Sequence, residues 1–223
     1  SIRPEHVRLS SAGGLAGAIR STPAIRVLGG VALFGLWEIG VRIFAAPFVA
    51  RPTDIVAAIP RVLTDPDYWS ASASTLSAVL IGLAIALVAG TLLGLVLGRI
   101  RGADRALSFW VSSFYAMPMI AALPLITVWF GFDSTARLAT IVFAALFSVA
   151  INVADGARSI PPEFLEVGRA YRAKTRHIWF DIALFSAVPY LIAGARLAAG
   201  RALIGAVLAE IYTSVDGLGY YIL

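Results

Sequence analysis

The chain contains no cysteine, which excludes disulfides, thiol nucleophiles and thiolate metal ligands. It has only two histidines, His6 and His177, and neither lies in a zinc-binding pattern such as H-E-x-x-H. The phosphate-binding pattern G-x-x-x-x-G-K-S/T is also absent, so the chain has no familiar loop for ATP. These absences argue against an enzyme, and we expect no catalytic residue, no cofactor, no metal and no nucleic-acid partner.

Charge is scarce as well, since charged residues make up 14% of the chain and soluble domains average about 25%. Hydrophobic residues make up 59% of the 223 residues, and the mean hydropathy is +0.85. They fall in blocks of about 20 residues, the length that crosses a bilayer as a helix. The sequence therefore predicts an all-α, polytopic membrane helix bundle with about five spans, at 24–46, 75–98, 107–130, 135–154 and 184–207. Residues 208–223 are too short and too rich in glycine to form a further ordinary span.

The basic residues indicate the orientation of these spans, because cytoplasmic loops carry an excess of Arg and Lys. They gather in the N-terminal segment, in the 99–106 loop and in the 158–181 segment. We expect these three regions in the cytoplasm, and the 47–74 segment and the C-terminal residues outside. The predicted organisation is a cytoplasmic segment at 1–23 followed by a single transmembrane domain at 24–223.

Two spans have distinctive patterns. The second carries a small residue at every fourth position, which places them on one helix face: Ala78, Gly82, Ala86, Gly90, Gly94 and Gly98. This stripe favours close helix packing, with a position on a translocation path as the alternative. The third span contains Pro118 and Pro124, each of which removes a backbone donor. Broken helices often line transport pathways, and a static kink is the alternative.

Four charged residues, Glu38, Arg196, Arg201 and Glu210, lie in or beside apolar segments. A charge in a span should face protein or water. Arg196 is predicted near the bilayer midplane, where it has either an anionic substrate or a structural partner such as Glu38. Arg201 lies closer to the end of the span, and its head group can reach outward.

The 158–181 segment is a charged stretch between two apolar blocks. Pro161 and Pro162 suit a helix start, and Glu163 and Glu166 lie in the first turns, where the helix dipole favours acids. The pattern predicts a short amphipathic helix at about 162–172 and a second short helix at about 174–181. The alternative is a solvated loop that binds nothing.

This segment resembles the cytoplasmic loop of bacterial ABC importer permeases, written E-A-A-x3-G-x9-I-x-L-P, in its residues Glu166, Ile182 and Leu184. The chain departs from that pattern at Gly168, Arg172 and Phe185, where the family has Ala, Gly and Pro. In the family the loop forms coupling helices that dock on an ATPase subunit. The resemblance is closest to the nitrate/sulfonate/taurine branch, and its most specific part is the run from Leu123-Pro124 to Trp129-Phe130-Gly131.

The resemblance implies a permease subunit in the bacterial plasma membrane that works by alternating access. Its implied partners are a second permease subunit, two ABC ATPase subunits and an extracytoplasmic solute-binding protein. It implies a small solute, such as a sulfonate, nitrate or a vitamin precursor, and one further span after Leu223. The expected ATPase contacts are Glu166, Gly168, Arg169, Arg172 and Ala173, and the expected path-lining residues are Pro118, Met119, Leu123 and Arg196.

Two other functions remain open. A stand-alone secondary transporter or channel would need no ATPase, and it should show paired ionisable residues in related halves. We find no convincing internal repeat. A structural or receptor subunit without transport is the second alternative, and the broken third span and the small-residue stripe argue mildly against it.

Overall fold

The computed structural model describes residues 22–44 and 49–223, so most of the predicted cytoplasmic segment 1–23 lies outside the described residues. The described chain forms helices and no strands, which confirms the all-α fold class. Four of its helices are long and apolar enough to cross a membrane, and a bent helix pair makes a fifth candidate. The chain divides into two compact units, residues 1–64 and 65–223.

The first unit contains the predicted first span, α2 (Thr22–Phe44), and a shorter helix, α3 (Pro52–Thr64). Glu38 near the end of α2 accepts hydrogen bonds from the side chain of Arg42, at 2.7 Å, and from the backbone N–H of Thr53, at 3.2 Å. Its carboxylate is therefore satisfied within this unit.

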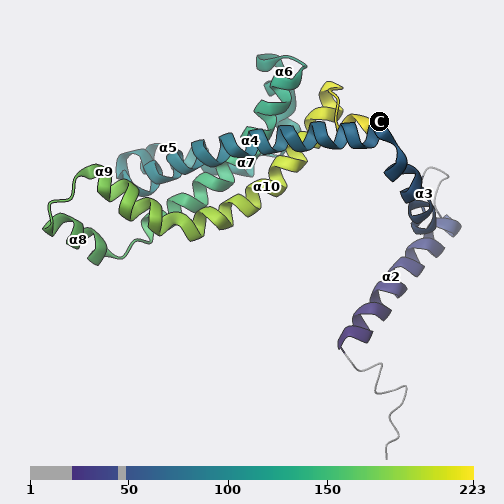
Figure 1. Cartoon of the computed structure of the whole chain (residues 1–223), viewed down its shortest axis with the longest axis horizontal. Helices are drawn as coiled ribbons and strands as arrows, with labels where there is room; N and C mark the ends of the chain where they lie inside the picture. The colour runs from purple at the N-terminus through teal and green to yellow at the C-terminus, as the bar shows by residue number, and fades with distance from the viewer. Residues whose placement is uncertain (1–21, 45–48) are drawn as a thin grey trace, which may run out of the picture. The chain divides into compact units, whose positions relative to one another are not determined.

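The second unit is built on three long helices, α4 (Pro66–Arg99), α7 (Ser134–Arg158) and α10 (Phe185–Thr213). Figure 1 shows them side by side, with α7 packed against both α4 and α10. Two of these helices begin at an aspartate that caps the first turn. Asp65 accepts from the N–H of Asp67, and Asp133 accepts from the N–H of Thr135 at 2.7 Å. That bond lowers the pKa of the Asp133 carboxyl below its ordinary value.

The small-residue stripe of α4 faces α7. A Cβ atom added at Gly90 would lie 2.7 Å from Cβ of Val149, and one at Gly94 would lie 2.6 Å from the carbonyl oxygen of Ala150. On the other side of α7, Gly205 of α10 leaves room for Ala144 in the same way. The stripe thus serves close helix packing, as the first of the two interpretations predicted.

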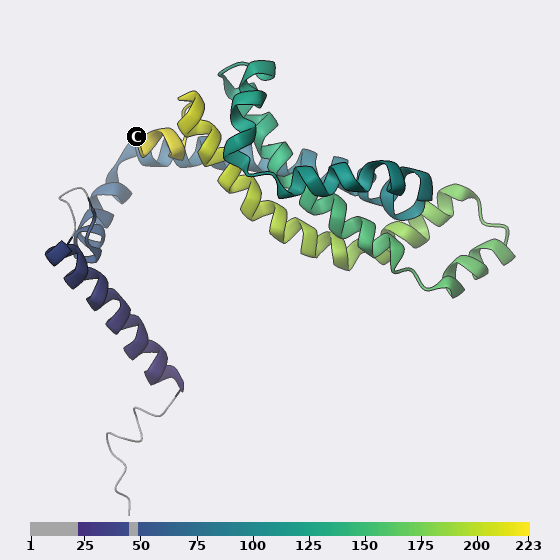
Figure 2. The same ribbon diagram turned by 180° about the vertical axis from the view of Figure 1, so that it is seen from behind.

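The third predicted span is not one helix. It consists of α5 (Arg101–Ala116) and α6 (Met119–Phe130), which are bent by 107° at a two-residue break. Met117 has an extended backbone because Pro118 disfavours a helical conformation in the residue before it. Pro124 lies inside α6 and does not break it. Figure 2 shows α5 running along the long helices and α6 turning away from them.

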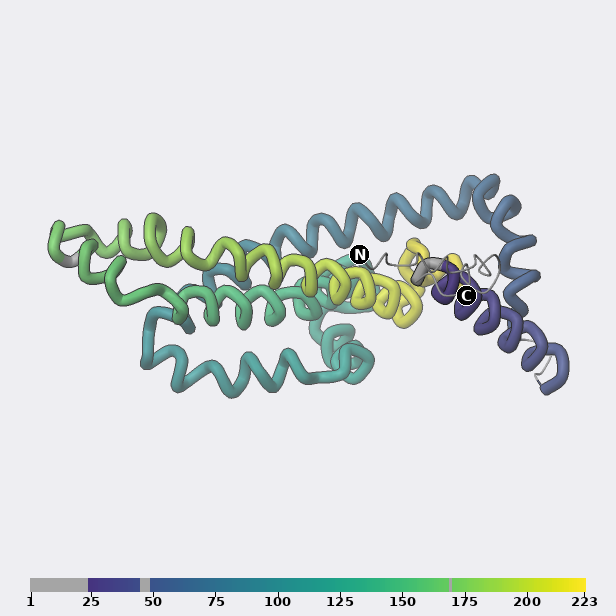
Figure 3. The backbone as a smooth tube through the Cα atoms, turned by 90° about the horizontal axis from the view of Figure 1, so that it is seen from below, coloured from purple at the N-terminus to yellow at the C-terminus, as the bar shows by residue number. Residues whose placement is uncertain are grey.

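Two predicted boundaries are wrong at the other end of this unit. The short helix α8 (Pro162–Ala170) ends two residues earlier than expected. The second short helix is not separate, because α9 (Thr175–His177) continues through the π-helix η1 (Ile178–Leu184) into α10 as one 39-residue helix. Figure 3 shows this continuous helix and, at its start, the connection from α7 that contains α8 (residues 159–174), called the α8 loop below. A short helix, α11 (Leu218–Tyr221), follows α10.

Candidate functional site

The α8 loop is closed by an unusual backbone turn. Arg172 has a left-handed conformation, with φ of 51°, and the N–H of Ala173 donates to the carbonyl oxygen of Gly168 at 2.8 Å. This is the bond of a Schellman motif, which usually has glycine at the left-handed position. The resemblance places a family glycine at the position of Arg172. The chain makes the turn without that glycine, so the departure from the pattern does not remove the bend.

Substituting Arg172 by glycine should stabilise this turn. The left-handed conformation costs a residue with a Cβ atom about 1–2 kcal/mol, and glycine lacks that cost. We expect Arg172→Gly to raise the midpoint of thermal unfolding of the detergent-solubilised protein by a few degrees. Arg176→Gly is the control, because glycine inside helix α9 should lower the midpoint. Equal losses in the two variants would contradict the assignment of strain to Arg172.

The predicted coupling residues are distributed over both sides of α8. Glu166 and Arg172 are exposed, Ala173 is half-buried, and the side chain of Arg169 lies outside the described part of the structure. Gly168 is buried, since a Cβ atom there would lie 3.2 Å from Cδ1 of Ile182. Gly168 therefore holds α8 against the start of the long helix, whereas Glu166 and Arg172 can meet a partner.

An exposed apolar face accompanies these charges, and the sequence reasoning missed it. Phe164, Val167 and Tyr171 follow one another at helical spacing, and their exposed fractions are 59%, 56% and 85%. Large apolar side chains gathered on one exposed face mark an interaction surface. The spacing of three and four residues was the sequence signal that could have revealed this face.

The four predicted path residues are not brought together. Pro118 lies exposed at the break between α5 and α6, Met119 is half-buried beside it, and Leu123 is buried on α6. Arg196 is exposed on α10 and makes no hydrogen bond or ion pair with the described residues. The described residues thus supply no structural partner for Arg196, and the alternative, an anionic substrate, stays a prediction.

Arg201 is the arginine that contacts the break. Its guanidinium carbon lies 3.8 Å from the ring centroid of Tyr115, and its Nη1 donates to the carbonyl oxygen of Tyr115 at 3.0 Å. Both groups border a cavity of about 390 Å³ between α5, α6, α7 and α10. The arginine that the sequence assigned to the outer part of the span is thus half-buried beside this cavity.

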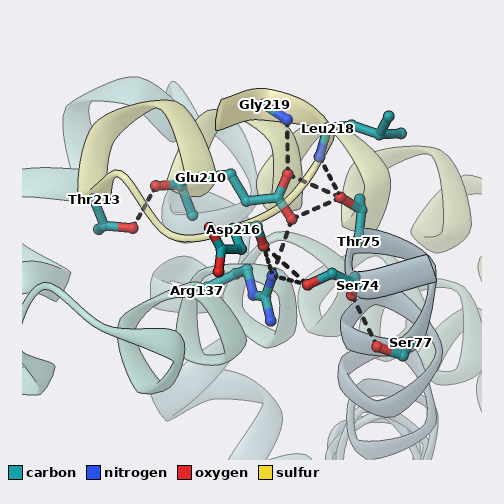
Figure 4. A network of polar contacts seen from close by, with 10 residues as sticks. Ser74, Thr75, Ser77, Arg137, Glu210, Thr213, Asp216, Leu218 and Gly219 are labelled. Carbon is teal, nitrogen blue, oxygen red and sulfur yellow. Dashed lines mark hydrogen bonds and ion pairs between the residues drawn. The ribbon is translucent and has the colours of Figure 1, made fainter. Parts of the chain in front are cut away.

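The second charged site is a buried network around Glu210, which has no exposed surface (Figure 4). Its carboxylate accepts from Thr75 Oγ1 at 2.9 Å, from Arg137 Nη1 at 3.2 Å and from the N–H of Gly219 at 2.9 Å. Thr75 in turn accepts from the N–H of Leu218 at 2.8 Å. The network joins α4, α7, α10 and α11. The sequence singled out Glu210 but not Arg137, which lies in the first turn of α7.

The sequence was compared with models of known protein families. Residues 86–223 match the model of the family described as the inner membrane component of binding-protein-dependent transport systems. The chain is a permease of this family. The matched part of the permease contains the α8 loop, the break between α5 and α6, and most of the Glu210 network. The permease is therefore a multi-pass membrane component of a transport system and has no enzymatic role of its own.

Three relatives are similar over most of the permease. The formylaminopyrimidine transport permease protein of Halalkalibacterium halodurans is 28% identical over 85% of the chain and 76% of the relative. A Bacillus subtilis permease protein named for aliphatic sulfonates transport is 25% identical, over 86% of the chain and 70% of the relative. The riboflavin transport system permease protein of Chloroflexus aurantiacus is 30% identical, over 84% and 70%.

Proposed function

We propose that the permease imports a small solute by alternating access, driven by ABC ATPase subunits that dock on the α8 loop. The observation that carries the proposal is the exposed face of α8, where large apolar side chains lie beside Glu166 and Arg172. The expected ATPase contacts remain Glu166, Gly168, Arg169, Arg172 and Ala173. Among them Gly168 acts by holding α8 in place, and the exposed residues make the contact.

The arrangement of the basic segments supports an orientation with the α8 loop in the cytoplasm. Arg158 at the end of α7 forms an ion pair with Asp104 in the first turns of α5. The basic corner between α4 and α5 and the α8 loop therefore lie at the same end of the unit. Basic ends belong on the cytoplasmic side, which supports the proposal that the Glu210 network lies outside. With α2 as a further span, the proposed location of the N-terminus is the cytoplasm.

We further propose that the permease forms a homodimer that receives solute from an extracytoplasmic binding protein. The path follows the break between α5 and α6, with Pro118, Met119 and Leu123 on that side and Arg196 on α10. The relatives are named for an aliphatic sulfonate, a formylaminopyrimidine and riboflavin. A small organic solute of this kind, anionic or a vitamin precursor, is the proposed cargo.

Reversing the charge of Glu166 tests the docking assignment. We expect Glu166→Lys to uncouple ATP hydrolysis from uptake in vesicles that contain the assembled transporter, because an exposed carboxylate is replaced by a cation at the proposed contact. Uptake should fall at least tenfold while the thermal unfolding midpoint stays within a few degrees. Asp54→Lys, the same reversal on α3 of the first unit, should leave uptake coupled.

Two outcomes would count against the proposal. Normal uptake in Glu166→Lys would remove Glu166 from the ATPase contact. Solute movement through the permease alone, in vesicles without nucleotide or ATPase, would favour the stand-alone transporter or channel. The assay that separates these functions is therefore uptake with and without the companion subunits.

A further inference from the structure

The cavity at the break between α5 and α6 combines one cation with an otherwise apolar wall. Its volume is about 390 Å³, and its lining includes Phe114, Met117, Met119, Phe143, Phe147 and Arg201. None of the described residues that line it is acidic. A pocket that is mostly apolar with one placed charge is the usual form of a small-molecule site.

The guanidinium of Arg201 is held in place but not neutralised. It stacks on the ring of Tyr115 and donates from Nη1 to the Tyr115 carbonyl oxygen, and it forms no ion pair with the described residues. Most of its N–H donors are therefore open to a ligand. A planar guanidinium fixed by stacking is well suited to bind a carboxylate or sulfonate through two hydrogen bonds.

The position of Arg201 in the helix makes an unneutralised charge costly. It precedes the end of α10 at Thr213 by about 18 Å at 1.5 Å per residue, so it lies in the interior of a helix that is apolar and long enough to cross a membrane. A charge at that depth normally pairs with another group or faces a water-filled cavity, and such residues mark substrate pathways. The ligand that would complete Arg201 is an anion that enters the cavity.

The apolar part of the cavity lining defines the rest of that ligand. Phe114, Phe143 and Phe147 form an aromatic cluster, with ring centroids between 5.2 and 5.9 Å apart. Met117 and Met119 add flexible thioether side chains, which adapt to varied apolar shapes. This wall accommodates an apolar or aromatic body, whereas a small inorganic anion would leave it empty.

We propose that this cavity is a solute site within the permease that binds an organic anion, with its acid group on Arg201 and its apolar body against the Phe114, Phe143 and Phe147 rings. The proposal rests on the proposed import function and deepens it. The permease would then select its solute a second time, after the binding protein, at the point where the third span is broken.

The test measures binding of toluenesulfonate to the assembled transporter in phosphatidylcholine nanodiscs, by titration calorimetry without binding protein or nucleotide. Methyl tolyl sulfone is the neutral comparison compound. We expect the sulfonate to bind, the sulfone to bind at least tenfold more weakly, and Arg201→Gln to weaken the sulfonate by about tenfold or more. Arg105→Gln removes an exposed charge from α5 outside the cavity and should keep the preference for the anion.

A second variant guards against misfolding of Arg201→Gln. Ile204 lines the cavity with 59% of its surface exposed, so Ile204→Trp should fill the site while Arg201 stays in place. This variant should also lose sulfonate binding. Equal binding of the sulfone and the sulfonate, no binding of either, or unchanged binding in Arg201→Gln would overturn the proposal. Competition by added phosphatidylglycerol would assign the cavity to a lipid headgroup and would overturn it as well.

The failure of this site and the failure of the import function give different results. Nucleotide-dependent uptake by the unmodified transporter reports on the import function alone. Sulfonate binding in nanodiscs reports on the cavity alone, because it needs neither nucleotide nor transport. If the transporter imports its solute but binds the sulfonate and the sulfone equally, the proposed import function stands and the proposed solute site is refuted.

Discussion

Replacing Glu210 by glutamine should destabilise the permease by about 3 kcal/mol or more, because it leaves the Arg137 cation without its buried partner. The Arg137 side chain is only 12% exposed, and the Glu210 side chain is fully buried. Glutamine keeps the size of the side chain and can still bond to Thr75. The loss therefore comes from the charge rather than from packing. It is measured as a fall in the thermal unfolding midpoint of the detergent-solubilised permease.

The double variant Glu210→Gln with Arg137→Gln is the control for this assignment. Removing both charges eliminates the orphaned cation, so the double variant should be more stable than the sum of the two single losses predicts. Strictly additive losses would mean that Glu210 and Arg137 do not stabilise each other. The attachment of α11 gives a second measurement, since Glu210 accepts a hydrogen bond from the N–H of Gly219 and Thr75 accepts one from the N–H of Leu218. Hydrogen exchange of those two amides should accelerate in Glu210→Gln.

Adding a single methyl group at Gly94 should cost about 1–3 kcal/mol, the usual effect of overpacking a close contact. A Cβ atom there would lie 2.6 Å from the carbonyl oxygen of Ala150 and 2.7 Å from Cβ of Val153. Neither neighbour is the end of a flexible side chain, so α4 and α7 would have to separate. We expect Gly94→Ala to lower the unfolding midpoint in the same detergent assay.

Gly200→Ala is the matched control for this substitution. Gly200 also lies in the middle of a long helix, but no atom would lie within 4 Å of a Cβ atom at that position. Alanine in place of glycine should therefore stabilise α10 by about 0.5–1 kcal/mol through helix propensity alone. A lower unfolding midpoint in Gly94→Ala and a higher one in Gly200→Ala would show that the loss arises from the contact between α4 and α7. A gain in Gly94→Ala would show that α4 and α7 do not pack as closely as described.

The spans were predictable from the sequence because hydrocarbon thickness sets the length of an apolar block. The ends of the helices were less predictable than the spans, since a helix continues into water wherever capping residues and local contacts support it. Helix α4 begins at Pro66, beside the capping Asp65, nine residues before the predicted start at 75. The break at Pro118 followed from its chemistry, whereas Pro124 obeys the same chemistry and stays helical.

The charged sites show where a single sequence stops being informative. Glu210 was recognisable as a charge that needed a partner, but Arg137 is 73 residues away, and no local pattern connects them. Arg201 and Tyr115 are 86 residues apart, and only the fold shows that they meet. By contrast, the coupling segment was predictable from local pattern, because its helix start, charges and turn lie within a few residues of one another. The exposure of its apolar face was less predictable, because spacing alone does not tell whether such a face packs against the neighbouring helices or stays exposed.

The glycine contacts on both sides of α7 restrict how the permease can move. Helices whose backbones touch through Gly90 and Gly94 on one side and Gly205 on the other cannot slide past each other without steric collision. Helices α4, α7 and α10 therefore form one rigid body and do not move independently of one another. Under the proposed alternating-access mechanism, a push at the α8 end would reach the Glu210 end as one movement of all three helices. Opening on one side of the bilayer and closing on the other would then be a single motion.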